Sequence, residues 1–192
     1  YHDLLDFING LAAMPEFASI HVVGRQIQAV IANWQDTHDF DCDYYYHGRA
    51  FTEGGCPYTE QQMMAAPYGV TWHGRYNHIG ESHYYFSDQP LGALREVHKH
   101  CSKKMPVQIA KMKPVQSVRL IDLSLEVKVP NKFLEYCRFS PEPADYNKVK
   151  REYLIPCYVA SCCKLHGIEG IKYYGSRDYT NYVTWKDGYL AY

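Results

Sequence analysis

Residues 69–97 read GVTWHGRYNHIGESHYYFSDQPLGALREV, and the fold expected for the rest of the chain is built outward from this stretch. It places Arg75 in a turn rich in Gly and Asn, continues into an aromatic segment that ends near Phe86, and then reaches a segment that carries Glu96. If the aromatic segment is a strand and packs against a following helix, a cation, an aromatic ring and a carboxylate converge on one ligand. Such a set of groups suits an anionic, aromatic, sugar-containing molecule.

Local sequence signals predict that strand and that helix. Residues 82–86 are rich in Tyr and Phe, which favour a half-buried strand. Ser87 and Asp88 offer side-chain oxygens that can cap a helix, and Pro90 is tolerated in a first helical turn. The helix is therefore expected to begin at Gln89 or Pro90.

Two stripes run along this predicted helix. Gly92, Ala93 and Glu96 share one stripe, whose small residues leave room for a ligand near the carboxylate. A simpler alternative is that Glu96 forms an ordinary surface ion pair with Lys99 or His100, one turn further on. The other stripe is apolar, recurs at helical spacing and is expected to face the core: Leu91, Leu94, Val97 and Cys101.

Composition narrows the class of protein. With 192 residues, of which 46% are hydrophobic, the chain suits one globular domain with terminal additions. A formal net charge of -1 and the lack of a Lys/Arg run argue against a general nucleic-acid binder. Seven scattered cysteines, an odd number, favour reduced thiols and a cytoplasmic location over a disulfide framework.

No membrane partner is expected. The longest apolar stretch, residues 153–163, contains Pro156 and is too short to span a bilayer. No signal peptide is visible, but the chain begins at Tyr1 without a methionine and can be a fragment of a longer protein.

The remaining segments alternate between helical and strand patterns. Residues 2–35 look mainly helical, and Arg49 ends a strand that begins with three tyrosines at 44–46. Residues 51–67 read as a long loop. Further strands are expected at 107–112, 117–123, 171–174 and 181–185, helices at 130–138 and 146–166 (with Pro156 as a start or a kink), and a turn at 140–145.

Two blocks of sequence carry a family resemblance. The first is GRYNHIG at 74–80, followed by HYYFSDQPLGALREV at 83–97, and the second is GIEGIKYYGSRDYTNYVTW at 167–185. Together they resemble the RES domain family, which is named for its Arg, Glu and Ser residues. With Arg49 matched to the first family arginine, the resemblance covers residues 44–185.

The resemblance implies a fold and an activity. RES domains are similar to ADP-ribosyltransferases, so it implies an α+β fold with a split mixed β-sheet and flanking helices, and an NAD+-binding catalytic domain over 44–192. The helical pattern of residues 2–35 and the polar residues after it indicate a helical N-terminal extension and linker over 1–43. The implied reaction is cleavage of the nicotinamide–ribose bond of NAD+, with water or inorganic phosphate as acceptor and no further cofactor or metal. The alternatives are transfer of ADP-ribose to a protein and an inactive domain that binds NAD+ or a partner.

The same resemblance implies partners. Several family members are toxins restrained by an antitoxin, so a role as a toxin or defence effector is expected, with a cognate antitoxin or regulatory domain as partner. Assembly into a homo-oligomer stays open.

Each matched residue has an expected role. Glu96 is expected to stabilise the oxocarbenium character that develops on the ribose, and Tyr85 to stack on or position the nicotinamide ring. Arg49 and Arg75 are expected to bind the pyrophosphate, because guanidinium groups bind phosphate oxygens in pairs. Ser176 is expected to donate a hydrogen bond to a phosphate or to the acceptor. The set implied as catalytic is Glu96, Arg75 and Ser176, and the set implied as binding is Arg49, Arg75, Tyr85, Ser176 and Asn181.

A zinc-stabilised binding module is the main rival from another class. Several Cys and His residues lie close together in sequence, but the spacing of Cys162 and His166 supplies only half of a structural zinc site. Cysteines on a helix are more often small core residues. The rival set is Cys157, Cys162, Cys163 and His166, with His98, His100 and Cys101 elsewhere.

Overall fold

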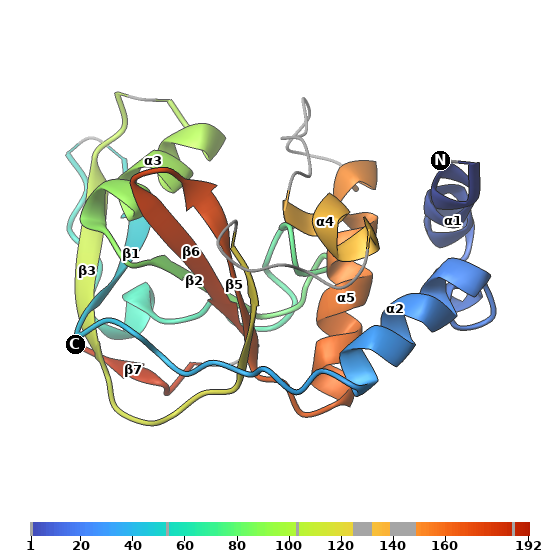
Figure 1. The fold of residues 1–192 in the computed structure, drawn as a ribbon. Coiled ribbons are helices and arrows are strands. Elements are labelled where there is room, and N and C mark those ends of the chain that lie inside the picture. The colour runs from blue at the N-terminus through green and yellow to red at the C-terminus, as the bar shows by residue number, and fades with distance from the viewer. Residues whose placement is uncertain (1, 53, 103, 125–131, 139–148, 186) are drawn as a thin grey trace.

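A mixed β-sheet occupies the left-hand part of the molecule in Figure 1. The computed structural model describes residues 2–52, 54–102, 104–124, 132–138, 149–185 and 187–192. Within these residues, seven strands run in the order β4-β5-β6-β2-β1-β3-β7. Their bounds are β1 Tyr45–Ala50, β2 Tyr84–Ser87, β3 Val107–Pro114, β4 Leu120–Leu123, β5 Gly170–Ser176, β6 Tyr179–Thr184 and β7 Leu190–Ala191.

The strand pairing is antiparallel except at one edge. β4 pairs with β5 in parallel, in the register Ile121 to Ile171, whereas β2 pairs antiparallel with both β1 and β6. Because β2 lies between β1 and β6, it joins residues 45–50 and residues 179–184, which are far apart in the sequence, in one sheet. The predicted α+β class and mixed sheet with flanking helices are confirmed. The short strand β7 was not predicted, and the turn expected at 140–145 lies outside the described residues.

The helices fall into two groups (Figure 1). α3 stands apart and packs on β1 and β3, while the other α-helices lie together on the opposite side of the view. Pro156 lies in the first turn of α5, where a missing N–H is tolerated, which explains why the helix begins later than the pattern suggested. The bounds are α1 His2–Ala13, α2 Val22–Ala32, α3 Pro90–His100, α4 Lys132–Arg138 and α5 Leu154–Leu165, with 3-10 turns η1 Pro15–Ser19, η2 Gln61–Met63 and η3 Arg151–Tyr153. None of the described helices has the length and apolar character needed to cross a membrane.

Helix α3 begins where the sequence predicted, but its most buried residues are small ones. Leu91 is 44% exposed, whereas Gly92 and Ala93 are buried. A β-carbon added to Gly48 of β1 would lie 2.9 Å from the carbonyl oxygen of Ala93, so the helix backbone approaches the strand too closely for any larger residue. The prediction that the apolar stripe faces the core was therefore wrong for Leu91, whereas Leu94, Val97 and Cys101 are half-buried.

The residues before α3 tie strands together and do not cap the helix. Gln89 occupies the N-cap position and makes no side-chain cap hydrogen bond. The Asp88 carboxylate accepts a hydrogen bond from the Thr180 N–H at 2.9 Å, and the Ser87 hydroxyl donates to the Thr180 carbonyl at 2.9 Å. The predicted capping role of Ser87 and Asp88 is thus replaced by a link between β2 and β6.

Candidate functional site

A cavity of about 600 Å³ opens between α3, the sheet and the loop at 66–81. Its volume is in the range typical of small-molecule sites. Strands β1, β2, β5 and β6 form the floor, and residues at 150 and 153 close one side. Four of the six residues predicted for the site line it, namely Arg75, Tyr85, Glu96 and Asn181.

Glu96 lies on the buried stripe of α3 and is held by several donors. Its Oε1 atom accepts hydrogen bonds from the Lys99 ammonium at 2.9 Å and from the Tyr179 hydroxyl at 2.8 Å. Burial by itself would raise the pKa of Glu96, but the charge of Lys99 and hydrogen bonds from Lys99, Asn181 and Tyr179 lower it below its ordinary value. The predicted ion pair with Lys99 is therefore present, and the carboxylate also faces the cavity.

Arg75 reaches the cavity from the turn and packs against aromatic rings. Its guanidinium carbon lies 5.6 Å from the ring centroid of Tyr173 and 6.0 Å from that of Tyr153, within the range of cation–π attraction. Burial opposes the charge, yet the Glu96 carboxylate is among the groups that favour it, and the pKa of Arg75 lies above its ordinary value. The cation and the carboxylate predicted from sequence thus interact electrostatically within one cavity.

Tyr85 fixes the shape of the turn that carries Arg75. Its hydroxyl donates to Asn77 Oδ1 at 2.8 Å and accepts from the Tyr76 N–H at 3.0 Å. A β-carbon on Gly74 would lie 2.1 Å from Asn77 Oδ1 and 2.8 Å from the Tyr85 hydroxyl, so glycine is required there for this contact. The Tyr85 ring lines the cavity while its hydroxyl serves the turn.

Arg49 and Ser176 lie outside the residues that line the cavity. The exposed Arg49 side chain donates to the Gln62 carbonyl, and its guanidinium carbon lies 4.4 Å from the ring centroid of Tyr58. The Ser176 hydroxyl accepts a hydrogen bond from the Asp178 N–H at 3.2 Å, which stabilises the turn between β5 and β6. The structure does not bring these two side chains to the groups around Glu96.

Several lining residues were not singled out from the sequence. Lys150 is buried, and it donates through its ammonium to the His73 carbonyl at 2.9 Å and through its N–H to His73 Nδ1 at 2.7 Å. Lys150 Nζ also lies 5.3 Å from the ring centroid of Tyr153, the ring that Arg75 approaches from another element. Residue 150 was placed inside a predicted helix, so only its tertiary position reveals a second cation at the cavity.

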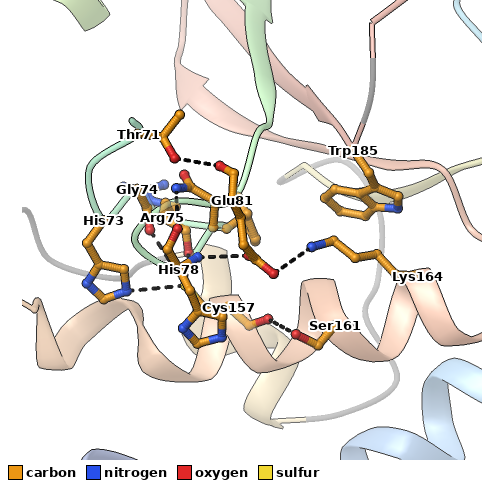
Figure 2. Close-up of polar contacts among 12 residues, drawn as sticks. Thr71, His73, Gly74, Arg75, His78, Glu81, Cys157, Ser161, Lys164 and Trp185 are labelled. Carbon is orange, nitrogen blue, oxygen red and sulfur yellow. Dashed lines mark hydrogen bonds and ion pairs between the residues drawn. The ribbon is translucent and has the colours of Figure 1, made fainter. Parts of the chain in front are cut away.

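One group of described residues has donor atoms close enough to hold a metal ion. The ligand atoms of His73, His78 and Cys157 lie within 4.8 Å of one another (Figure 2). Because His73 Nδ1 accepts the Lys150 N–H, the neutral ring carries its proton on Nε2, which lies 3.4 Å from Cys157 Sγ. A metal ion bound to Nε2 would displace this proton. If the proton moved to Nδ1, two N–H donors would face each other there, and the hydrogen bond from the Lys150 N–H would be lost.

Protonation of these groups follows from their surroundings. Burial, together with the nearby His78 and Lys150, lowers the pKa of His73 to about 4. Burial raises the pKa of the Cys157 thiol well above its ordinary value. A neutral imidazole that donates to a neutral thiol satisfies both groups without an ion. Of the zinc set considered from sequence, Cys162 and Cys163 lie on α5 and are buried in the apolar core.

Glu81 and Lys164 form a second ion pair at the cavity, besides that of Glu96 and Lys99. Glu81 lines the cavity, and its Oε1 accepts from the Lys164 ammonium at 3.1 Å, while its Oε2 accepts from the His78 N–H at 2.9 Å (Figure 2). Burial would raise the pKa of Glu81, but these hydrogen bonds and the charge of Lys164 lower it. The Glu81 carboxylate is therefore ionised, and the positive charge of Lys164 balances its negative charge.

No family model, no curated protein and no solved structure matches this chain.

Proposed function

We propose that this chain binds NAD+ in the cavity and cleaves the bond between nicotinamide and ribose, on an α+β fold of the ADP-ribosyltransferase type. The observation that carries the proposal is the meeting of Arg75, Glu96, Tyr85 and Asn181, from a turn, a helix and two strands, around one cavity. These are the residue types that the resemblance to RES domains implied.

The chemistry assigns one task to the carboxylate. When the bond between the ribose carbon and the nicotinamide nitrogen breaks, the electron pair leaves with nicotinamide, which becomes neutral, and positive charge develops on the ribose. An ionised Glu96 stabilises that charge, and its low pKa keeps it ionised at neutral pH. Water then adds to the ribose carbon and loses a proton to give ADP-ribose, or inorganic phosphate adds to give a phosphorylated ADP-ribose.

The cations have a binding task. Arg75 presents a guanidinium that can hold two phosphate oxygens at once, and Lys150 adds a second positive charge beside the same tyrosine ring. We assign the pyrophosphate to these two residues. Arg49 and Ser176 have no part in the proposed mechanism, since neither lines the cavity.

Product analysis tests the proposal. Purified protein is incubated with NAD+ with and without inorganic phosphate, and the products are separated chromatographically. Nicotinamide is expected, together with ADP-ribose or a phosphorylated ADP-ribose. Glu96→Gln is expected to reduce the rate by about a hundredfold or more, the effect of losing one electrostatic stabiliser in other enzymes. Arg75→Lys, which keeps the charge and loses the paired hydrogen bonds, is expected to raise KM.

Matched variants control for charge and folding. Arg95→Lys is the control for Arg75→Lys: Arg95 lies on α3, and its guanidinium pairs with the exposed Asp178 at 3.0 Å. Glu16→Gln is the control for Glu96→Gln, because Glu16 is an exposed glutamate near the N-terminus. Both are expected to keep full activity. If wild-type protein releases no nicotinamide, the cleavage reaction is rejected. ADP-ribose attached to protein would assign the alternative, a transferase on the same site.

A further inference from the structure

Trp72 is a large apolar side chain that the fold leaves open to solvent at the cavity. It is 68% exposed and lines the cavity, together with Val70, which is 64% exposed. Tyr68, at 84%, and Ile79, at 54%, are exposed on the same loop but are not among the lining residues. The loop thus offers one aromatic ring to the cavity and another away from it.

The backbone that carries Trp72 is fixed in place. The Trp72 carbonyl accepts a hydrogen bond from Asn77 Nδ2 at 2.8 Å, and Asn77 is in turn bonded by the Tyr85 hydroxyl. On the neighbouring residue, the Thr71 hydroxyl donates to the Glu81 carbonyl at 2.7 Å. Because this backbone is already ordered, little conformational entropy of the loop is lost when a flat ring stacks on the Trp72 side chain.

A series of neighbouring side chains connects the Glu96 carboxylate with the two cations of the cavity. From Glu96, contacts lead through Tyr173 to Arg75, then through Tyr153 to Lys150, which is bonded to His73, the residue after Trp72. An anionic group of a ligand is expected to bind between Arg75 and Lys150, the two cations of this series. In this series Lys150, and not Glu96, is the charged group bonded to the residue next to Trp72.

The part of the cavity where Thr71, the residue before Trp72, bonds to Glu81 favours an uncharged ring. Glu81 is compensated by Lys164, and burial and the charge of Lys164 lower the pKa of His83 to about 4, so this histidine is neutral at pH 7. His83 lines the cavity, and neither of its ring nitrogens has a hydrogen-bond partner among the described residues. A neutral heteroaromatic ring suits this surface better than a phosphate or a cation does.

We propose that Trp72 is the platform on which the adenine of NAD+ stacks, with the diphosphate at Arg75 and Lys150 and the nicotinamide ribose at Glu96. This assignment rests on the proposed function for the orientation of the dinucleotide. Stacking on an aromatic side chain contributes enough that its removal weakens binding by about fivefold to about a hundredfold.

Calorimetric titration of ADP-ribose and of nicotinamide mononucleotide tests the assignment. Trp72→Ala is expected to weaken ADP-ribose binding within the range above, while Trp72→Phe keeps most of the affinity because a ring remains. Tyr68→Ala is the matched control, since it removes a more exposed ring of the same loop that does not line the cavity. Nicotinamide mononucleotide, which lacks adenine, is expected to bind Trp72→Ala and wild type equally.

The outcomes separate this inference from the proposed reaction. Adenine nucleotides that bind in a Trp72-dependent way while NAD+ stays intact would support the platform and reject the reaction. Nicotinamide release that is as fast from nicotinamide mononucleotide as from NAD+ would support the reaction and overturn the platform. Equal weakening by Trp72→Ala and Tyr68→Ala, or unchanged ADP-ribose affinity in Trp72→Ala, would also overturn it.

Discussion

The Glu96 carboxylate shows how single side chains set the chemistry of this cavity. Burial opposes its negative charge, and donors from three positions reverse that effect: Lys99 one turn along α3, and Tyr179 and Asn181 on β6. Only Lys99 could be connected to Glu96 from local sequence, because helical spacing relates the two. Tyr179 and Asn181 arrive through the sheet.

Removal of the Tyr179 hydroxyl is expected to raise the pKa of Glu96. A group whose folded pKa lies below its unfolded value contributes stability above the unfolded pKa and loses it as pH falls through the folded pKa. Tyr179→Phe removes one donor to the carboxylate, so protonation and the loss of that stability should begin at a higher pH. The measurement is a pH titration of the Glu96 carboxyl carbon by NMR, assigned with Glu96→Gln.

Tyr189→Phe provides the control for this titration. It removes a similar phenol-to-carboxylate hydrogen bond, from the Tyr189 hydroxyl to Glu169 at 2.6 Å, among residues that do not line the cavity. The Glu96 titration should be unchanged in that variant. A Tyr179→Phe protein whose Glu96 titrates as in wild type would show that the hydroxyl does not hold the carboxylate.

At the scale of the element, the packing of α3 decides which of its residues are functional. The sequence pattern marked the apolar stripe as the buried one, yet Gly92 and Ala93 are the buried residues of α3, and Gly48 of β1 lies directly against the Ala93 backbone. Helical periodicity identifies stripes but does not rank them when a small-residue stripe permits closer packing. Of the small residues that were expected to make room for a ligand, Ala93 lines the cavity and also contacts strand β1, whereas Gly92 makes room for the Tyr179 ring.

Enlarging Gly92 is expected to destabilise the protein. A β-carbon there would lie 2.2 Å from Ser87 Oγ and 2.7 Å from the Tyr179 ring, so Gly92→Val must push the helix away from the sheet. Overpacking of this kind costs about 1–3 kcal/mol, which a urea unfolding curve would measure. Leu91→Ala, on the exposed side of the same turn, should change stability by about 0.5 kcal/mol or less. Equal midpoints for the two variants would contradict the close packing of α3.

At the scale of the whole molecule, the N-terminal helices share a hydrophobic core with the sheet. Phe7 of α1 is fully buried, and its ring lies 5.7 Å from that of Tyr158 on α5. Ile27 and Ile31 of α2 belong to the same cluster as Ile171 and Val183 of the sheet. Residues 1–43 were expected to be an extension, and their amphipathic pattern could not show which surface they cover.

Truncation of Phe7 is therefore expected to weaken the entire fold. Phe7→Ala removes a fully buried ring and should lower the free energy of unfolding by about 3–5 kcal/mol in a single transition. Leu5→Ala, on the same helix and 61% exposed, serves as the control and should have little effect. If Phe7→Ala unfolds α1 and α2 separately at lower denaturant while the sheet persists, the two parts do not form one cooperative unit.

From the sequence alone, the family resemblance implied the α+β class and the mixed sheet with flanking helices, and local patterns determined most strand positions and the start of α3. Hydrophobic periodicity, turn residues and proline act over a few neighbouring residues, so these features can be read locally. Only the tertiary structure decided that Lys150 and Trp72 line the predicted cavity, that the Tyr179 hydroxyl bonds to Glu96, and that Arg49 and Ser176 stay outside the cavity. These placements depend on which face of each element is buried and on contacts between residues distant in sequence, which local patterns do not encode.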